Sequence, residues 1–468
     1  MQKNVSSSPM EKTTSICCAQ YASEKDDKGG LCMDDRISRL HDVILVSILS
    51  LLTMKEAGRT SLLSKRWRYT WTYITGLNFD SLLVIYGIKL REKKVEVERP
   101  LYLSWVDQVL KLHNAPTIDE FRVQFDLDET CRLDIDNWIN FAMEKRVRRL
   151  ELDLSEGVAG SREEEKKYNF PDPYGITNHL HSLSLGFTRC NFLTNLLLTG
   201  VNVNGQILEY VLTNCPLLEQ LFVKKSDSLV NLKVPDQSLK LKRLEIIKCF
   251  NVKSIEIFAM NLMSFRYHGP KINLPFKNVQ PPIDLFIGGE YCDFLIYKFL
   301  EISSYLSQLE SLALQMPSFM ENNLEDAKFP VLNKLKRLDL KIGSIDGIDF
   351  LAFAPLIEAC PFLSKFVFQL EWCESTRKLK HSMFTSRPHQ YLKVVEIIGF
   401  VGLTSDVELA MYLIKSAINL EKITFDTRKP LLIGTPWEFM ETKEKKVARK
   451  HAKKLGTKLP AGATLVII

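Results

Sequence analysis

The chain has 468 residues, of which 46% are hydrophobic and 25% are charged, and its 62 basic and 56 acidic side chains give a net charge of +6. These values are ordinary for a globular protein and predict a substantial buried core. The basic excess is too small to indicate a nucleic-acid-binding protein, so we expect no nucleic acid among its partners.

The beginning of the chain is polar and lacks the apolar centre of a secretory signal, so we predict a disordered tail over residues 1–34. The longest strongly apolar run extends only from Val43 to Leu52. A membrane-spanning helix needs about 20 consecutive apolar residues. We therefore expect a soluble protein without a membrane segment, located in the nucleus or the cytoplasm.

Ten cysteines are scattered along the chain without a C-x-x-C pair. Most stand in apolar segments, where a free cysteine behaves as a small hydrophobic residue. This distribution favours reduced, buried thiols in an intracellular protein over a zinc site. The adjacent Cys17 and Cys18 in the predicted tail are interpreted as incidental, with a reactive pair as the alternative.

A small helical module is predicted over residues 35–80. Its first helix, 42–52, has a broad apolar stripe because apolar residues recur at spacings of three and four: Ile44, Leu45, Ile48, Leu49 and Leu52. A second helix is expected over 55–63, with Ala57, Leu62 and Leu63 facing inward. Ser64 is expected to cap a third helix that carries Trp67 and Trp71. Three short helices leave part of this apolar surface uncovered.

After a connecting segment over residues 81–117, one pattern recurs to the end of the chain: an apolar residue, two others, then two apolar residues separated by one. Leucine-rich repeats have this spacing, and each repeat contributes one short strand. The longest interval, 47 residues between Phe265 and Leu312, is expected to contain a degenerate repeat at 283–288. The predicted repeat strands lie in segments 118–123, 147–152, 180–185, 218–223, 241–246, 262–267, 309–314, 335–340, 363–368, 392–397 and 420–425.

Between these strands, segments 205–216, 350–361 and 405–420 have helical patterns, and the first two end in Cys-Pro, which stops a helix. The predicted fold is therefore α/β: a short three-helix module followed by a curved leucine-rich-repeat solenoid, with parallel strands on the concave side and helices and loops on the convex side. Residues 160–168 are predicted to be a charged surface loop. The stretch 441–455 is predicted to be a basic amphipathic helix with Ala448, Ala452 and Leu455 inward, closing the solenoid; a nuclear-localisation or anion-binding patch is the alternative.

The stretch DRISRLHDVILVSILSLLTMKEAGRTSLLSKRWRYTW (35–71) resembles the plant form of the F-box, and residues 391–426 resemble the FBD segment that accompanies it in many plant proteins. Together with the repeats, the resemblance covers the chain from about Asp35 onward. It divides the sequence into a tail (1–34), an F-box (35–80), a connecting segment (81–117), leucine-rich repeats (118–386) and an FBD-like segment that caps the solenoid (387–468).

The resemblance implies the substrate-recognition subunit of an SCF-type (Skp-cullin-F-box) E3 ubiquitin ligase. Such a subunit binds a Skp-type linker protein, and through it a cullin, by the F-box, and it holds a target protein on the repeats. Large exposed apolar patches usually mark interfaces, which suits the apolar surface of the module. The linker-facing residues that the resemblance implies are Leu40, Ile44, Leu45, Ile48, Leu49, Leu52 and Trp67.

Two residues depart from the family pattern, because His41 and Thr53 stand where the family has proline. Proline pre-sets the backbone at a helix start, so its loss at His41 is expected to cost about 1 kcal/mol. A weakened F-box leaves a second interpretation open, in which the chain is a repeat scaffold outside any ligase. A third, a DNA-reading helix around Lys65, Arg66 and Arg68, is opposed by the acidic residues nearby.

Repeat-strand residues between the inward apolar positions face the concave surface, the usual binding face of a solenoid. The basic and aromatic ones lead to the hypothesis that an acidic or phosphorylated segment binds there, with ordinary surface charge as the alternative. The candidate target-binding residues are Phe222, Lys224, Arg243, Arg266, His268, Arg337 and Lys341.

We expect no catalytic residue, cofactor or metal, because the sequence contains none of the common catalytic or phosphate-binding motifs. The histidines His179 and His181 flank a predicted repeat strand, where the H-x-H spacing puts both rings on one face; packing and surface hydrogen bonds are favoured over metal binding.

Overall fold

The computed structural model describes residues 37, 39–90, 93–155, 167–172, 190–235, 240–272, 283–300, 303–316, 328–343, 350–371, 387–435 and 437–468. The predicted tail, the strand predicted at 180–185, His179 and His181, and Cys17 and Cys18 lie outside these residues.

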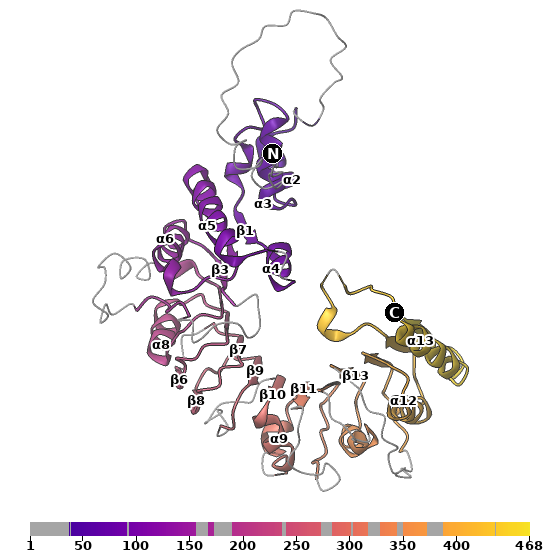
Figure 1. Ribbon diagram of the computed structural model, residues 1–468. Coiled ribbons are helices and arrows are strands. Elements are labelled where there is room, and N and C mark those ends of the chain that lie inside the picture. Colours follow the sequence, from indigo (N-terminus) through magenta and orange to yellow (C-terminus); the bar gives the residue numbers. More distant parts are fainter. Residues whose placement is uncertain are drawn as a thin grey trace, which may run out of the picture.

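One parallel sheet runs through the described part of the chain and curves into an open arc (Figure 1). Its 14 strands stand in chain order, with only β6 and β8 left out of the series. They are β1 (Gly76–Asp80), β2 (Glu120–Gln124), β3 (Arg149–Asp153), β4 (Asn195–Thr199), β5 (Gln220–Lys224), β7 (Arg243–Ile247), β9 (Ser264–His268), β10 (Asp284–Gly288), β11 (Ser311–Met316), β12 (Arg337–Ile342), β13 (Lys365–Leu370), β14 (Val394–Ile398), β15 (Lys422–Asp426) and β16 (Thr464–Ile467). Strands β6 (Asn231–Val234) and β8 (Ser254–Ile257) form a separate parallel pair.

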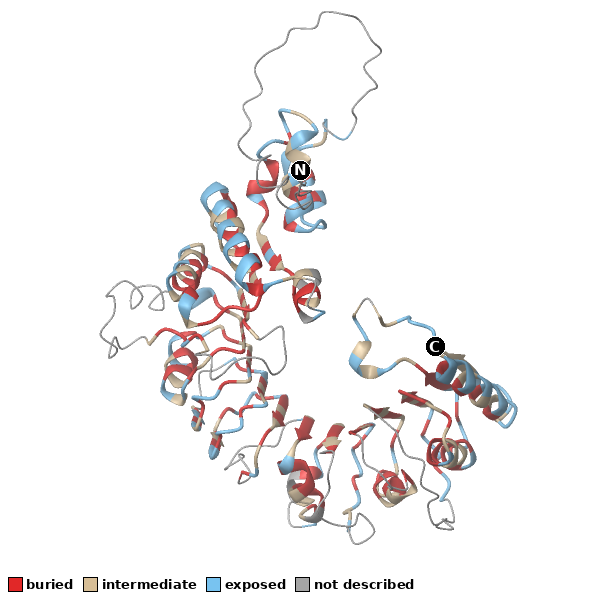
Figure 2. Ribbon diagram, in the orientation of Figure 1, coloured by how far each residue is buried: buried red, intermediate tan, exposed pale blue. Residues whose placement is uncertain are grey.

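The strands form because alternate residues are apolar and pack away from solvent. In β3, Leu150 and Leu152 are fully buried while Glu151 between them is half-buried. Neighbouring strands pair in parallel so that equivalent repeat positions stand side by side; for example, Leu150 of β3 pairs with Leu196 of β4. This register stacks the leucines of successive repeats into one continuous core, shown red in Figure 2.

Helices cover the convex side of the sheet, where α6, α8, α9 and α12 lie outside the arc (Figure 1). The structure confirms the predicted helices at 205–216, 350–361, 405–420 and 441–455, and Ala448, Ala452 and Leu455 are buried as expected. The helices after the first module are α4 (Leu82–Lys89), α5 (Val95–Leu112), α6 (Arg132–Glu144), α8 (Gly205–Asn214), α9 (Glu290–Tyr297), α10 (Ser303–Leu306), α11 (Ala354–Glu358), α12 (Thr404–Ser416) and α13 (Lys443–Gly456), with 3₁₀ turns η4 (Glu129–Cys131), η5 (Cys190–Phe192), η7 (Phe350–Phe353) and η8 (Pro430–Leu432).

The predicted repeat strands within the described residues are confirmed, including the degenerate repeat, which is β10. Strand β4 pairs directly with both β3 and β5, so it occupies the place that the sequence assigned to 180–185. The prediction of a charged surface loop over residues 160–168 is wrong at the carboxyl-terminal end of that range. Tyr168 is fully buried, and its hydroxyl donates a 2.5 Å hydrogen bond to Asp136 on α6.

The first module consists of α2 (Asp42–Leu49), α3 (Met54–Arg59), η2 (Thr60–Leu62) and η3 (Thr70–Tyr73). The predicted third α-helix is wrong, because the chain after Ser64 forms turns and then the 3₁₀ helix η3. Its two tryptophans, Trp67 and Trp71, are nevertheless both buried.

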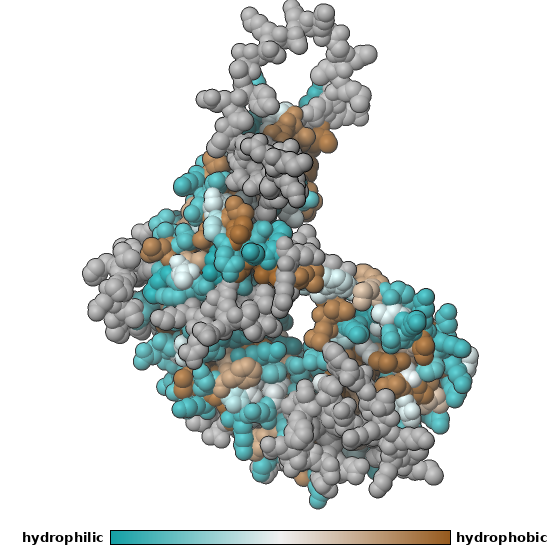
Figure 3. Space-filling view, in the orientation of Figure 1, coloured by the Kyte–Doolittle hydropathy of each residue, from teal (hydrophilic) through white to brown (hydrophobic). Residues whose placement is uncertain are grey.

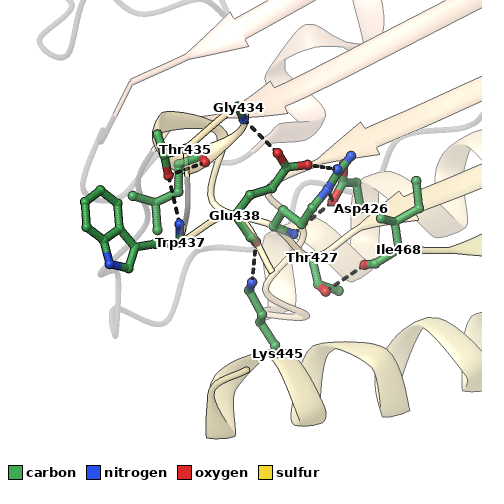
Figure 4. A network of polar contacts seen from close by, with 10 residues as sticks. Asp426, Thr427, Gly434, Thr435, Trp437, Glu438, Lys445 and Ile468 are labelled. Carbon is green, nitrogen blue, oxygen red and sulfur yellow. Dashed lines mark hydrogen bonds and ion pairs between the residues drawn. The ribbon is translucent and has the colours of Figure 1, made fainter. Parts of the chain in front are cut away.

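The two ends of the arc touch through a loop that we call the strap, residues 427–435 and 437–442, between β15 and α13. The rings of Trp437 on the strap and Tyr86 on α4 lie 5.4 Å apart in an edge-to-face arrangement. Figure 4 shows how the strap is held: the Lys445 ammonium donates to the Glu438 carbonyl, and the Thr427 hydroxyl donates to the carbonyl of Ile468. Arg428 pairs with both Asp426 and Glu438, which fixes the base of the strap.

Replacing Trp437 by alanine is expected to increase amide hydrogen exchange in α4 several-fold. The aromatic contact contributes about 0.5–1.5 kcal/mol, and its loss frees α4 from the strap, whose Trp437 stands 351 residues after Tyr86. Hydrogen-exchange mass spectrometry measures this directly. The matched control is Phe439→Ala on the same strap, because Phe439 is 75% exposed. Unchanged exchange in α4 for Trp437→Ala would show that the contact does not persist in solution.

Candidate protein-docking surfaces

The two residues that replace family prolines both cap helices. His41 precedes α2 with φ −62°, and its imidazole accepts a 3.4 Å hydrogen bond from the Val43 amide. Thr53 precedes α3 with φ −65° and forms a full capping box with Glu56. Proline fixes φ near −65°, so both residues already adopt its backbone angle and add a hydrogen bond that proline lacks at the cap. The structure thus supplies a local reason why the module forms without these prolines.

An apolar surface extends over α2 and the turns that follow α2 and α3. Its large side chains are exposed, whereas Leu45 and Leu49 of α2 are buried. Figure 3 shows brown, apolar residues on this module at the upper end of the molecule. We call this surface the apolar patch; its members are Val43, Ile44, Ile48, Leu51, Leu52, Leu62 and Leu63. Leu51 is the most exposed of them, at 84%. Such a concentration of exposed aliphatic side chains is typical of a protein interface.

The residues predicted to face the linker divide between this patch and the core. Ile44, Ile48 and Leu52 are exposed, and Leu40 is half-buried. The side chains of Leu45, Leu49 and Trp67 are instead buried in the core. They hold the module together and are not presented at its surface. The burial of these three residues corrects the sequence-based expectation that they form part of the docking surface.

Sequence reasoning also misplaced the pair Leu62 and Leu63. Both were expected to face inward, yet they are 73% and 69% exposed, while Ala57 is buried as expected. The chain leaves the helical path after α3, and η2 turns these leucines toward solvent. Together with Val43 and Leu51, they are patch residues that the resemblance did not indicate. The only feature of the sequence that could have indicated their exposure is that the module has more leucines than a core of its size can bury.

Basic side chains around the module serve as structural ties. The guanidinium of Arg66 donates to the Leu40 carbonyl at 2.5 Å and to the Asp42 carboxylate at 2.8 Å, which fastens the start of α2. Hydrogen bonding and the charge of Arg66 lower the pKa of Asp42. The ammonium of Lys55 lies 4.6 Å from the ring centre of Trp105 on α5. Burial lowers the pKa of Lys55. The Lys55 contact ties the helical module to α5, whereas the Arg66 contacts hold the module itself together.

The concave face of the sheet carries all seven candidate target-binding residues. Strand register places them in three rows: Arg243 and Arg337 in the first, Phe222 and Arg266 in the second, and Lys224, His268 and Lys341 in the third. The rows lie opposite the buried face on which the helices pack, as the alternation of the sequence predicts. The candidates on β5, β7 and β9 are adjacent, whereas those on β12 are separated from β9 by β10 and β11.

Two of the candidate arginines on this face, Arg266 and Arg337, pair with carboxylates of the same or the adjacent row. The Arg266 guanidinium lies 3.4 Å from the Glu245 carboxylate and 4.5 Å from the ring centre of Phe286. Arg337 forms a forked pair with Asp339, at 2.7 Å for the shortest contact. Burial raises the pKa of Glu245 even though Arg266 opposes that effect. The predicted basic patch is therefore largely an alternating surface of opposite charges.

His268 packs closely against the next strand. A side chain on Gly288 of β10 would come within 2.6 Å of the imidazole, so glycine is needed there. Burial and then the charge of Lys248 lower the pKa of His268, and its Nδ1 atom is buried without a hydrogen-bond partner. Burial therefore favours the neutral form of this imidazole.

The described residues contain no group of three or more His, Cys, Asp or Glu side chains arranged to hold a metal ion. None of the helices in the described ranges has the length and apolar character needed to cross a bilayer. The described residues form two candidate surfaces for binding a partner, the apolar patch and the concave face.

Comparison with known proteins matches both parts of the chain. Residues 37–75 match the F-box domain, and residues 109–455 match the domain described as At1g61320/AtMIF1, LRR domain. In Arabidopsis thaliana, F-box/LRR-repeat protein At3g03360 is 31% identical over 257 residues, which is 50% of this chain and 47% of the relative. Putative F-box/LRR-repeat protein At3g18150 is 31% identical over 332 residues, which is 66% of each chain. F-box/FBD/LRR-repeat protein At4g00160 is 25% identical over 421 residues, 84% of this chain and 86% of the relative.

The chain thus spans about half the length of the first of these relatives and two thirds of the second. The match to the repeat domain alone covers most of the chain, and the F-box match coincides with the module that bears the apolar patch. The chain belongs to the plant family of F-box/FBD/LRR-repeat proteins.

Proposed function

We propose that this chain is a substrate-recognition subunit of an SCF-type E3 ubiquitin ligase. The observation that carries the proposal is the apolar patch on the F-box, whose exposed side chains have no cover among the described residues. An F-box implies binding of a Skp1-like linker, and F-box/LRR proteins are typically non-catalytic adaptors. Each large aliphatic side chain that a partner buries fully contributes roughly 1.5–3 kcal/mol, which offsets part of the cost of association.

The role of the chain in this proposal is to bring two proteins together. A target held on the concave face of the solenoid has a high effective concentration near the conjugating enzyme that the cullin carries. No residue of this chain takes part in the transfer of ubiquitin. In this proposal the target binds the concave face around β5, β7 and β9, where the candidates Phe222, Lys224, Arg243, Arg266 and His268 lie on adjacent strands.

Co-purification tests the proposal. The tagged full-length chain is expected to retain a cullin only when a Skp-type linker protein is also present, because the linker bridges the two. Retention of the linker alone, with no cullin, would contradict assembly of a ligase. Failure to retain the linker would favour the alternative function, a repeat scaffold outside the ligase.

A further inference from the structure

The excess positive charge of the chain is concentrated in one short stretch. Residues 441–458 contain eight basic and two acidic side chains, which is a net charge of +6. The whole chain, with 62 basic and 56 acidic residues, has the same net charge of +6, so all its other residues together are neutral. Helix α13 forms most of this stretch, and its charge distinguishes it from the rest of the solenoid.

Helix α13 has a buried side and a basic side. Ala448, Ala452 and Leu455 are buried, and the helix packs on α12 and β16 at the end of the arc (Figure 1). The exposed lysines of α13 recur at spacings of three and four, which puts them together on the opposite side of the helix, along roughly 17 Å of its length. We call this surface the lysine face; its members are Lys443, Lys446, Lys450, Lys453 and Lys454.

The nearby carboxylates do not neutralise the lysine face. Glu441 pairs with Arg449 at 2.9 Å, and Glu444 is the single acidic residue within α13. In the part of the chain that the structure describes, no side chain of the lysine face forms an ion pair. After residue 350, the residues outside the described ranges are 372–386 and 436, and they contain one acidic and three basic side chains. The lysine face therefore keeps its positive charge.

Exposed apolar side chains adjoin the lysine face. Val447 stands within it, four residues after Lys443 and three before Lys450, and is 52% exposed. Phe439 and Met440, at the end of the strap and just before α13, are 75% and 53% exposed. Lysines beside exposed apolar side chains are typical of a surface that binds to a bilayer, where the ammonium groups meet anionic head groups and the apolar side chains reach the boundary of the acyl chains.

We propose that the lysine face, together with Phe439 and Met440, binds the surface of a bilayer that contains anionic phospholipids. Helix α13 lies on this surface without inserting, because its own apolar side is buried against the solenoid. A lysine ammonium is a point charge on a flexible stem, so it pairs with head groups that change position in a fluid surface. The binding requires only this chain and is independent of the proposed function.

A nucleic acid, the other common polyanion, fits this surface less well. Residues 443–458 contain no asparagine or glutamine, and their one arginine is paired with Glu441, so the side chains that read base edges are not presented. The exposed apolar side chains of Phe439 and Met440 also gain nothing against a phosphate backbone. These features favour a lipid surface.

Co-sedimentation of the purified full-length chain with lipid vesicles tests the proposal. The vesicles are phosphatidylcholine with about one lipid in three replaced by phosphatidylserine, and vesicles of phosphatidylcholine alone are the comparison. The variant combines Lys446→Gln, Lys450→Gln and Lys453→Gln. Each lysine near an anionic surface strengthens binding about fivefold, so the affinity of the variant is expected to fall about a hundredfold with the melting temperature unchanged. The unaltered chain is not expected to sediment with the neutral vesicles.

The matched control is Lys111→Gln with Lys240→Gln and Lys253→Gln, which removes the same charge from exposed positions elsewhere on the chain. It is expected to change the vesicle affinity by less than about twofold, because distant charges are screened. An unchanged affinity of the lysine-face variant would overturn the proposal. An equal loss in the control would also overturn it, because it would show a response to net charge alone.

A second variant, Phe439→Ala with Met440→Ala, distinguishes a bilayer from other polyanions. It is expected to weaken vesicle binding roughly fivefold, because two apolar side chains no longer reach the acyl boundary. An unchanged vesicle affinity would overturn the assignment to a bilayer, as would tighter binding of a double-stranded DNA oligonucleotide than of the vesicles at equal phosphate concentration. The titrations contain no linker protein, so failure of the ligase proposal leaves their result interpretable.

Discussion

Replacing Ile44 and Ile48 together by aspartate is expected to weaken binding of a Skp-type linker by about a hundredfold or more without unfolding the chain. Both side chains belong to the apolar patch and are exposed, at 47% and 38%. A charge there costs little in the free protein but must be desolvated when the linker covers it. Isothermal titration calorimetry with the purified linker measures the change.

The control for this variant replaces two leucines elsewhere that are more exposed than either isoleucine, Leu112→Asp with Leu133→Asp. It is expected to bind the linker as the unaltered chain does. Unaltered linker affinity in the patch variant would mean that the linker binds another surface. Leu45 is unsuitable for this experiment, because its side chain is fully buried and an aspartate there would unfold the module.

Replacing Trp138 by alanine is expected to lower the free energy of unfolding of the first repeats by about 3–5 kcal/mol. Trp138 on α6 is 1% exposed, and its indole donates a 2.7 Å hydrogen bond to the Asp107 carboxylate on α5. Its ring also contacts Tyr102, which stacks on Phe125 at 4.4 Å. Alanine leaves a cavity between these helices and the sheet and removes the partner of Asp107.

Urea unfolding followed by tryptophan fluorescence and by limited proteolysis measures the effect of Trp138→Ala. Each repeat contacts mainly its neighbours, so cleavage is expected to begin in residues 76–153. The control is Leu133→Ala on the same helix, which is 64% exposed and is expected to change stability by less than about 0.5 kcal/mol. Equal stability of the two variants would contradict the packing described for Trp138.

The repeat strands could be predicted because a half-buried strand repeats every two residues and the apolar spacing recurs along the chain. Ambiguity arose where two segments carried the same spacing. Residues 193–198, LTNLLL, fit the pattern as well as 180–185 do, and β4 is formed by the former. Strands β1, β6 and β8 were not predicted, although residues 74–79, 229–234 and 252–257 carry the same apolar spacing; β16 was not predicted either, because it has no alternation.

The division of the F-box residues between core and surface could not be predicted from spacing. Nearly every residue of α2 is apolar, so the sequence does not show which face packs inward. That face is decided by the module's other core residues, Trp67 and Trp71 among them, which lie along turns and a 3₁₀ helix. The core therefore buries Leu45 and Leu49 and leaves Ile44 and Ile48 exposed.

The solvent-facing side of the repeat strands could be predicted, but its charge balance could not. Alternation along each strand identifies the residues that face away from the core. Whether an arginine is free depends on what stands beside it on the next strand, and the Arg266 and Glu245 pair joins strands whose register the sequence does not give.

The central claim is that the F-box of this chain docks a Skp-type linker through the apolar patch. A calorimetric titration of the purified full-length chain with the purified linker tests it most directly. The predicted result is a one-to-one complex with a Kd of about 1 μM or below, lost in Ile44→Asp with Ile48→Asp and kept in Leu112→Asp with Leu133→Asp. No binding by the unaltered, folded chain at about 100 μM linker would contradict the claim.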